Sequence, residues 1–407
     1  MLTLNIMSGD SVNPSFLISN VRLSDGASVD VAISGGRIEA IGANLPRDTD
    51  VVVEDGGSAL VLPGFVEGHT HLDKTNWGLP WYRNEVGPRL VDRIENERSW
   101  RASSGHDAGK QSLALARAFV AAGTTRIRTH VDVDTDAGLE HLEGVLETRE
   151  TLVGVADIQI VAFPQSGMLR RPGTDALLGD ALKSGADVLG ALDPALIDQD
   201  PVKSLDTTFA ISDRYQKPVD IHLHEPGEVG AFTIKLLLDR VEALGMQGRV
   251  VISHAFCLGM LPDRERDVLL ARIAQLSVAL LTTAPPSVPV PSLRACIERG
   301  VTLFAGNDGI RDTWTPFGSP DMLERAMFVA MRHDLRRDVD LALAFDCVST
   351  LGAHACGFAD YGLHVGARAD LVLVDAATVA HAVVARPVRK LVVSNGRVVA
   401  RNGAMLA

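Results

Sequence analysis

The stretch LVLPGFVEGHTHLDK, residues 60–74, joins an apolar run to two histidines separated by one residue. The run Leu62–Gly68 is short and mostly apolar, which predicts a buried strand. His69 and His71 follow at its end. Alternate residues of an extended chain share one face, so both imidazoles point to one place, and imidazole is a ligand that zinc and iron accept. The stretch therefore predicts a buried strand that ends in a metal-binding pair.

Downstream, similar apolar runs alternate with amphipathic stretches. GKQSLALARAFVAAG (109–123) and EVGAFTIKLLLDRVEALG (228–245) have the spacing of helices that cover a core. Buried strands alternating with helices predict an α/β fold with a parallel sheet, and eight such units predict a closed, TIM-like (β/α)8 barrel. An open doubly wound sheet is the alternative, although no G-x-G-x-x-G motif follows the first strand. The eight expected strands are Leu62–Gly68, Thr125–Thr129, Ile158–Phe163, Val188–Leu192, Pro218–Ile221, Val250–Ser253, Leu276–Leu281 and Val301–Ala305.

Polar side chains gather at or just after the ends of these strands. In an α/β barrel the catalytic groups stand at the carboxyl ends of the strands, so this placement predicts one site at the mouth of the barrel. The residues concerned are His69, His71, His130, Gln165, Asp193, His222, His224, His254, Thr282, Thr283 and Asp308.

Four of these positions, and the adjacent Glu225, suggest specific roles. His222 and His224 repeat the spacing of the first pair, and either is a candidate ligand. Glu225 follows directly as a candidate proton carrier, unless it only caps a helix dipole. His254 follows an apolar strand and is assigned to the site because the other strand ends converge there. Asp308 ends a buried strand, where an unpaired charge is costly, so we expect it to be a ligand or a base.

A further alternating trio, His130, Asp132 and Asp134, lies in the stretch THVDVD. A second metal site is one interpretation of this trio. We prefer a supporting role, because the first site already has enough ligands. Gln165, in VAFPQSG, offers an amide to a substrate.

Both ends of the chain have a strand-and-turn pattern that differs from the middle. FLISNVRLSDG and SVDVAISGGRIEAIGA alternate apolar and polar residues, and Asn395-Gly396 separates two apolar runs, which indicates a β-hairpin. We therefore expect residues 1–60 and 359–407 to form one small β-sandwich domain and residues 61–358 to form the barrel.

Composition limits the functions to consider. The formal net charge is −12, whereas a protein that binds nucleic acid usually presents a basic surface. The N-terminus, MLTLNIMSGDSVNPSF, has no signal-peptide pattern, and no apolar run of about 18 residues suggests a membrane span. The four cysteines have no C-x-x-C spacing and are expected to be reduced core residues. We expect a cytoplasmic homo-oligomer with a small heterocyclic substrate and neither nucleic acid nor membrane as a partner.

Taken together, several motifs resemble those of the amidohydrolase superfamily, specifically its cytosine deaminase-like branch. They are GFVEGHTHLDKT, THVDVD, VAFPQSG, VDIHLHE, SHAF and GNDGIRDTWTPFG, in the family's order and over nearly the whole chain. HTHLDK, VAFPQSG and IRDTWTPFGSPDM are also similar to the N-isopropylammelide amine-hydrolase relatives. The resemblance implies a distorted barrel of the metal-dependent hydrolases.

The resemblance also implies roles for individual residues. One divalent metal ion, Zn2+ or Fe2+, would be held by His69, His71, His222 and Asp308. Asp193 follows the fourth strand in place of a bridging lysine, which favours one metal over two. The implied catalytic residues are Glu225 as proton shuttle, His254 beside the attacking water and Asp308 as its base, and the implied substrate-binding residues are Gln165, His224, Trp314 and Asp193.

The expected activity is hydrolytic removal of ammonia from an amino-substituted nitrogen heterocycle. Gly309 and His224 stand where cytosine deaminases carry acidic residues, so the substrate is expected to differ from cytosine. One alternative is an N-alkylamine hydrolase acting on s-triazines such as N-isopropylammelide, and another is a cyclic amide hydrolase. A non-enzymatic binding protein on a degenerate barrel would lack a ligand or Glu225, and none of these is missing.

Overall fold

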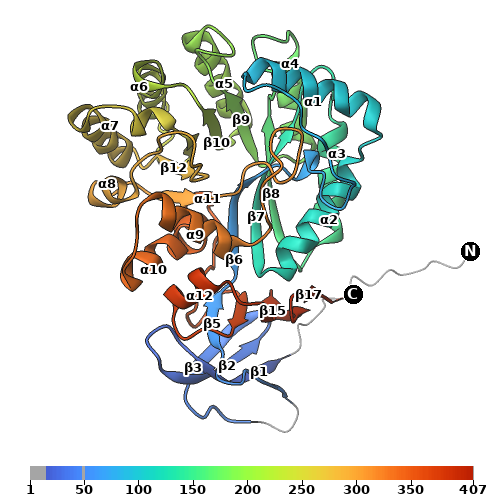
Figure 1. Cartoon of the computed structure of the whole chain (residues 1–407), viewed down its shortest axis with the longest axis vertical. Coiled ribbons are helices and arrows are strands. Elements are labelled where there is room, and N and C mark those ends of the chain that lie inside the picture. The colour runs from blue at the N-terminus through green and yellow to red at the C-terminus, as the bar shows by residue number, and fades with distance from the viewer. Residues whose placement is uncertain (1–14, 48–50, 407) are drawn as a thin grey trace, which may run out of the picture.

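The computed structural model describes residues 15–47 and 51–406, and within them the strands form two sheets. The larger body is an α/β barrel with eight parallel strands in chain order (Figure 1). A parallel bridge between Thr70 and Asp308 brings the first and last strands together, so the barrel is nearly closed. The expected barrel is confirmed, and its strands are β6 (Phe65–Thr70), β7 (Thr124–Asp132), β8 (Asp157–Phe163), β9 (Val188–Leu192), β10 (Val219–Leu223), β11 (Val250–His254), β12 (Ala279–Thr282) and β13 (Leu303–Ala305).

Helices surround the barrel strands, as Figure 1 shows. They include the two amphipathic stretches singled out in the sequence, which form α2 (Ala108–Ala121) and α6 (Gly227–Ala243). The other helices are α1 (Leu90–Ser104), α3 (Glu140–Thr151), α4 (Thr174–Ser184), α5 (Pro201–Tyr215), α7 (Asp263–Gln275), α8 (Leu293–Glu298), α9 (Met322–Arg332), α10 (Asp338–Asp346), α11 (Thr350–Cys356) and α12 (Val379–Ala385), with short 3-10 turns η1 (Leu72–Lys74) and η2 (Phe256–Gly259).

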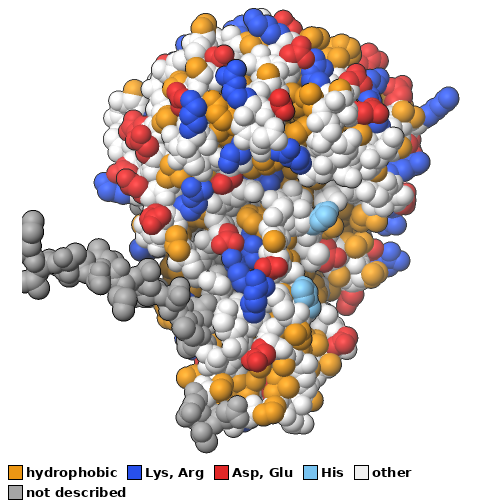
Figure 2. Space-filling model, turned by 180° about the vertical axis from the view of Figure 1, so that it is seen from behind, with side chains coloured by type: hydrophobic (Ala, Val, Ile, Leu, Met, Phe, Trp, Pro, Cys, Tyr) orange, Lys and Arg blue, Asp and Glu red, His pale blue; other side chains and the backbone are white. Residues whose placement is uncertain are grey.

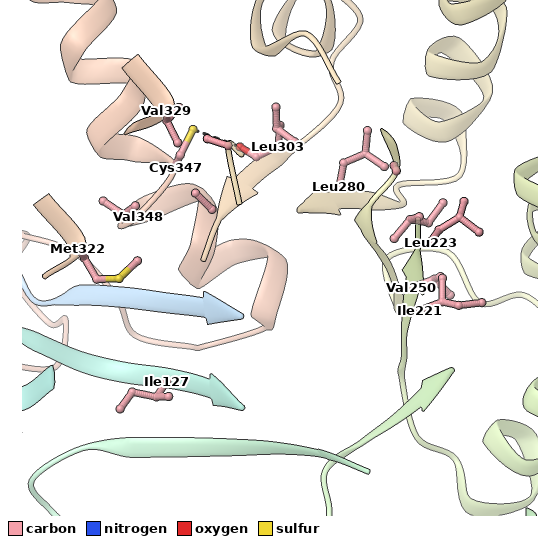
Figure 3. Close-up of a cluster of buried hydrophobic side chains, with 14 of the residues drawn as sticks. Ile127, Ile221, Leu223, Val250, Leu280, Leu303, Met322, Val329, Cys347 and Val348 are labelled. Carbon is pink, nitrogen blue, oxygen red and sulfur yellow. Dashed lines mark hydrogen bonds between the residues drawn. The ribbon is translucent and has the colours of Figure 1, made fainter. Parts of the chain in front are cut away.

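The alternation of strand side chains separates an apolar layer from a polar interior. In β10, Ile221 and Leu223 belong to the main hydrophobic core, where they lie with residues of neighbouring strands and helices (Figure 3). Asp220 and His222 alternate with these residues along β10 and therefore point to the opposite side, into the barrel. The outer face holds the helices by apolar packing, which leaves the inner face free to carry polar chemistry.

The first expected strand, Leu62–Gly68, is wrong as a single element. The structure divides it at Gly64 into β5 (Leu60–Pro63), which pairs with strands of the second sheet, and the barrel strand β6. A Cβ on Gly64 would lie 2.3 Å from the Thr125 hydroxyl, so only glycine fits where the chain passes between the sheets. A continuous apolar run contains no sign of this change of sheet.

The other strand boundaries differ from expectation by up to three residues, and the two largest differences are at the end of β7 and the start of β12. The strand expected at Thr125–Thr129 extends as β7 to Asp132, so His130 and Asp132 lie within it. The strand expected at Leu276–Leu281 begins only at Ala279, because the preceding residues close the last turn of α7, where Val278 donates to the carbonyl of Ile273.

The second sheet is built from both chain ends and lies below the barrel in Figure 1. The described chain contributes nine strands to it: β1 (Phe16–Arg22), β2 (Ser28–Ser34), β3 (Arg37–Gly42), β4 (Val52–Asp55), β5, β14 (Leu371–Val374), β15 (Arg389–Ser394), β16 (Arg397–Arg401) and β17 (Ala404–Met405). The expected hairpin at Asn395-Gly396 joins β15 and β16, and both residues have positive φ angles, +48° and +75°, as a tight hairpin turn requires.

Two further features of the sequence have a structural explanation. The segment Asp338–Cys356 is long and apolar enough to cross a membrane by length and composition alone. It comprises α10 and α11, which pack against α9, α12 and β6, so contacts inside the molecule account for its apolar character. The four cysteines are buried and unpaired, as expected. Residues 1–14, in which no signal peptide was recognised, lie outside the described residues.

Acidic and basic side chains are interspersed over the face of the molecule in Figure 2, as the mixed composition indicates. Other charged side chains are buried and connect the two sheets. Asp370, at the start of β14, accepts hydrogen bonds from Arg126 of β7 at 3.2 Å and from Arg368 at 2.8 Å. Asp370 and Arg126 are each 3% exposed, so this link between the two bodies is a buried ion pair.

We predict that Asp370→Ala lowers the free energy of unfolding by about 3–5 kcal/mol. The change removes a buried carboxylate that pairs with both Arg126 and Arg368, and it leaves Arg126 only its ion pair with the partly exposed Asp157. Urea denaturation, followed by circular dichroism, measures this change. Asp360→Ala is the matched control, since Asp360 pairs with Arg37 on the surface. Equal midpoints for the two variants would show that the buried pair does not stabilise the junction.

Candidate active site

Four residues that are distant in the sequence meet at the mouth of the barrel. One ligand atom from each of His69, His71, His222 and Asp308 lies within 4.8 Å of the others. Asp308 Oδ1 is 3.2 Å from His71 Nε2 and 3.8 Å from His69 Nε2. The structure thus brings together the complete ligand set expected from the sequence.

The chemistry of this cluster fits a divalent cation. His69 Nε2, His71 Nδ1 and both ring nitrogens of His222 are buried without a hydrogen-bond partner in the described structure. Burial, together with neighbouring histidines, holds the pKa values of His69 and His222 well below the ordinary value, so both rings are neutral at pH 7 and have lone pairs to donate. Neutral imidazoles and a carboxylate are the donors that zinc and iron prefer.

Asp308 is held in place by the backbone around His69. Its amide donates to the His69 carbonyl at 2.7 Å, and its φ of +66° is an unusual conformation for a non-glycine residue. The buried Glu67 carboxylate accepts from the side chain of Asn307 at 2.6 Å and from the His69 amide at 2.9 Å. Glu67 therefore holds both sides of the closing barrel in register beside the ligands.

The electrostatic surroundings favour the ionised form of Asp308. Burial alone would raise its pKa, but the hydrogen bond with His71 and the nearby rings of His254 and His69 hold the pKa well below the usual range. The side chain is 38% exposed, whereas those of His69 and His71 are 0% and 3% exposed. The cluster consequently opens to the mouth on the Asp308 side.

His254, His224 and Asp193 form a row along one side of the cluster. His254 Nε2 lies 3.8 Å from Asp308 Oδ2, and burial lowers the pKa of His254 to about 3. The His254 and His224 ring centroids are 4.4 Å apart, and His224 Nδ1 lies 2.8 Å from Asp193 Oδ2. Burial would lower the pKa of His224, but Asp193 raises it, so the His224 ring is protonated more readily than the rings of His69 and His222.

Glu225 lies next to His224 in the chain, but its carboxylate is bonded by the loop after β9 and by α6. One carboxylate oxygen accepts from the backbone amides of Ala195 at 2.6 Å and Leu196 at 3.3 Å, and the other bonds the Thr233 hydroxyl. No hydrogen bond or ion pair joins Glu225 to the four-residue cluster in the described structure. Burial raises the pKa of Glu225, which favours a protonated carboxyl group.

His130, Asp132 and Asp134, at and just after the end of β7, lie in three separate environments. The ring of His130 lies 4.0 Å from that of His69, and its Nε2 is 3.5 Å from Asp220. Asp132 pairs with Arg101 at 2.6 Å, and Asp134 accepts from the Ser166 hydroxyl at 2.7 Å. The two aspartates already have partners, so the trio itself does not form a second metal site. A smaller group of possible ligands, His69, His130 and Asp220, shares His69 with the main cluster.

The expected substrate residues Gln165 and Trp314 lie on the other side of the mouth, where Lys74 connects them. The Lys74 ammonium donates to Gln165 Oε1 at 2.5 Å and lies 5.5 Å from the Trp314 ring centroid. The Trp314 indole N–H donates to Glu97 of α1 at 2.7 Å. Because Lys74 takes the carbonyl side of the Gln165 amide, the NH2 group remains for another partner.

Lys74, Glu97 and Arg101 were not among the site residues predicted from the sequence. Lys74 lies in the motif HTHLDK but was given no role, and its charge is buried among Glu97 and Asp132. Glu97 and Arg101 are four residues apart and therefore share one face of α1, a helix not anticipated from the sequence. The signals available in the sequence were a lysine three residues after the His-x-His motif and two opposite charges four residues apart, Glu97 and Arg101.

Comparison with known proteins identifies the family. The model of the Amidohydrolase family matches residues 53–400. The chain belongs to this family. It is 33% identical, over 96% of its length and 98% of the relative, to the N-isopropylammelide isopropyl amidohydrolase of Pseudomonas sp. strain ADP.

Solved amidohydrolase structures agree with this assignment. N-isopropylammelide isopropylaminohydrolase from Burkholderia multivorans has a TM-score of 0.95 and 64% identity, covering 97% of this chain and 100% of that one. The 5-methylcytosine deaminase from Klebsiella pneumoniae has a TM-score of 0.84 and 25% identity, covering 95% and 97%. The protein is accordingly a hydrolase of carbon–nitrogen bonds other than peptide bonds, in a metal-dependent family.

We predict that His69→Ala loses bound metal, because it removes one imidazole from the cluster and leaves a cavity there. Elemental analysis of the purified protein measures the metal content. His354→Ala, which changes an exposed histidine of α11, is the control and should keep the wild-type content. Equal metal content in both variants would exclude His69 as a ligand.

Proposed function

We propose that the protein hydrolyses the exocyclic C–N bond of an N-alkylamino-s-triazine of the N-isopropylammelide type and releases an alkylamine. The observation that carries this proposal is the 64% identity, over 97% of the chain, to a structure named for this activity. Release of ammonia from an aminated heterocycle, the main expectation from sequence, becomes the second candidate. It keeps support from the likeness to 5-methylcytosine deaminase.

The wall formed by Lys74, Gln165 and Trp314 supports a planar, oxygen-bearing ring as substrate. The Lys74 ammonium and the Gln165 NH2 group are donors, which complement the oxygen substituents of an ammelide-type ring. Phe163, whose ring lies 4.1 Å from that of His222, and Trp314 add aromatic surface on which such a ring can stack. Binding to this wall would orient the exocyclic nitrogen towards the ligand cluster.

We further propose that the cluster holds one divalent cation, zinc or iron. His69, His71, His222 and Asp308 supply a complete donor set for one ion. The position after β9 that a bridging lysine would need is occupied by Asp193, whose carboxylate already accepts from the His224 amide at 2.6 Å. When bound, the cation lowers the pKa of water and so supplies a nucleophile at neutral pH.

The residues around the cluster account for the proton transfers of this reaction. Asp308, ionised and open to the mouth, accepts a proton from the attacking water, and His254 orients that water. Glu225, whose pKa burial raises, carries a proton to the ring nitrogen and then to the departing amine. The new C–O bond replaces the C–N bond, and the amine leaves with the proton that it needs to be a stable product.

Separate detection of the two products distinguishes the leaving groups. We predict that the metal-loaded enzyme releases isopropylamine from N-isopropylammelide faster than it releases ammonia from aminopyrimidines, pterins or aminotriazines. The reason is that the chain is 64% identical to an N-isopropylammelide isopropylaminohydrolase but only 25% identical to a 5-methylcytosine deaminase. Chromatography of the amine and an enzymatic ammonia assay measure the rates. Faster ammonia release would favour the second candidate instead.

We predict that Glu225→Gln abolishes turnover but keeps wild-type metal content, because an amide preserves the shape and cannot carry the proton. Steady-state rates and elemental analysis test the two parts. Glu228→Gln, on the exposed first turn of α6, is the control and should leave the rate unchanged. A near wild-type rate for Glu225→Gln would remove Glu225 from the mechanism.

A further inference from the structure

A column of polar side chains crosses the barrel interior beneath the ligand cluster. It starts at Arg128 of β7, whose guanidinium donates to Asp220 Oδ2 of β10 at 2.9 Å. The Ser253 hydroxyl of β11 donates to Asp220 Oδ1 at 2.7 Å. Ser253 Oγ in turn lies 3.1 Å from His69 Nδ1 of β6. All four residues are buried, so water does not compete for these bonds.

The direction of the hydrogen bonds follows from the donors available. A carboxylate paired with a guanidinium accepts hydrogen bonds and has none to give. Ser253 must therefore use its single proton on Asp220, and its oxygen can only accept from His69. This assigns the proton of the His69 ring to Nδ1 and leaves the lone pair on Nε2, which faces Asp308.

The other imidazoles of the cluster have no comparable support. Both ring nitrogens of His222 and Nδ1 of His71 lack a hydrogen-bond partner in the described structure. His71 is held only by its contact with Asp308 inside the cluster. Among the three histidines of the described chain, His69 is the one whose far nitrogen is bonded from outside the cluster, so its tautomer and ring orientation are set before any cation binds. Partners of this kind, which bond the far nitrogen of a ligating histidine, raise its basicity and hold its ring.

We propose that Asp220 and Ser253 are positioning residues that prepare His69 as the anchoring ligand of the cation. Without the Ser253 hydroxyl, the His69 ring can rotate or take the other tautomer, in which Nε2 carries the proton and cannot ligate. The proposal rests on the cation site of the proposed function, but it does not depend on the substrate or on the leaving group.

Ser253→Thr and Ser253→Val form a matched pair for testing this proposal, because the two side chains share a shape and only threonine keeps the hydroxyl. The purified apo-proteins are loaded with Zn2+ alone, and the affinity is measured by competition with a chelator. We expect Ser253→Val to bind Zn2+ roughly 10–100-fold more weakly than Ser253→Thr. The unfolding temperatures of the two apo-proteins should be similar, which separates positioning from general stability.

Equal Zn2+ affinity in the threonine and valine variants would overturn the proposal. If neither variant folds, Ser253→Ala is compared with the control variant Ser212→Ala. Ser212 is a buried serine of α5 whose hydroxyl donates to the Lys217 carbonyl and does not contact the cluster. Weaker Zn2+ binding only in Ser253→Ala then supports the proposal, and equal binding overturns it. Turnover is not measured, so failure of the proposed substrate and failure of this inference are distinguishable.

Discussion

The site depends on neutral imidazoles that are buried beside an ionised carboxylate. Burial removes water from His69 and His222 and lowers their pKa values, while the surrounding rings stabilise the charge of Asp308. Within the described chain, His69 Nε2 and both ring nitrogens of His222 have no hydrogen-bond partner. Leaving them without a bond costs free energy, and binding of a cation recovers it. The remaining architecture can be understood as the support for this arrangement.

The closed parallel sheet provides that support by directing every second side chain of each strand inward. Buried charges in the interior need a partner: Arg128 forms an ion pair with Asp220, and the Glu67 carboxylate accepts a hydrogen bond from the Asn307 amide. These contacts join strands that are far apart in the chain, so the interior is both a polar core and a frame for the ligands. The outer faces of the same strands are apolar and hold the helices.

The proposed substrate-binding wall has a different structural origin from the four-residue cluster. Lys74, Gln165 and Trp314 come from loops after three different strands, and α1 adds Glu97 to orient the indole. Loops and an inserted helix can vary without disturbing the barrel, whereas the ligands sit on or next to strands. This division explains how one family combines a common hydrolytic centre with many heterocyclic substrates, and why the fold alone does not name the substrate.

The sequence by itself determined the barrel and its polar mouth, because strand periodicity, apolar runs and His-x-His spacing are local properties. It also placed His69, His71, His222 and Asp308 at strand ends before any contact was known. Only the tertiary structure decided what lies between strands: the change of sheet at Gly64, the length of β7, the contact of Lys74 with Gln165, and the hydrogen bond from His69 to Ser253. These features depend on which residues of distant segments come into contact. The local sequence pattern does not specify such contacts.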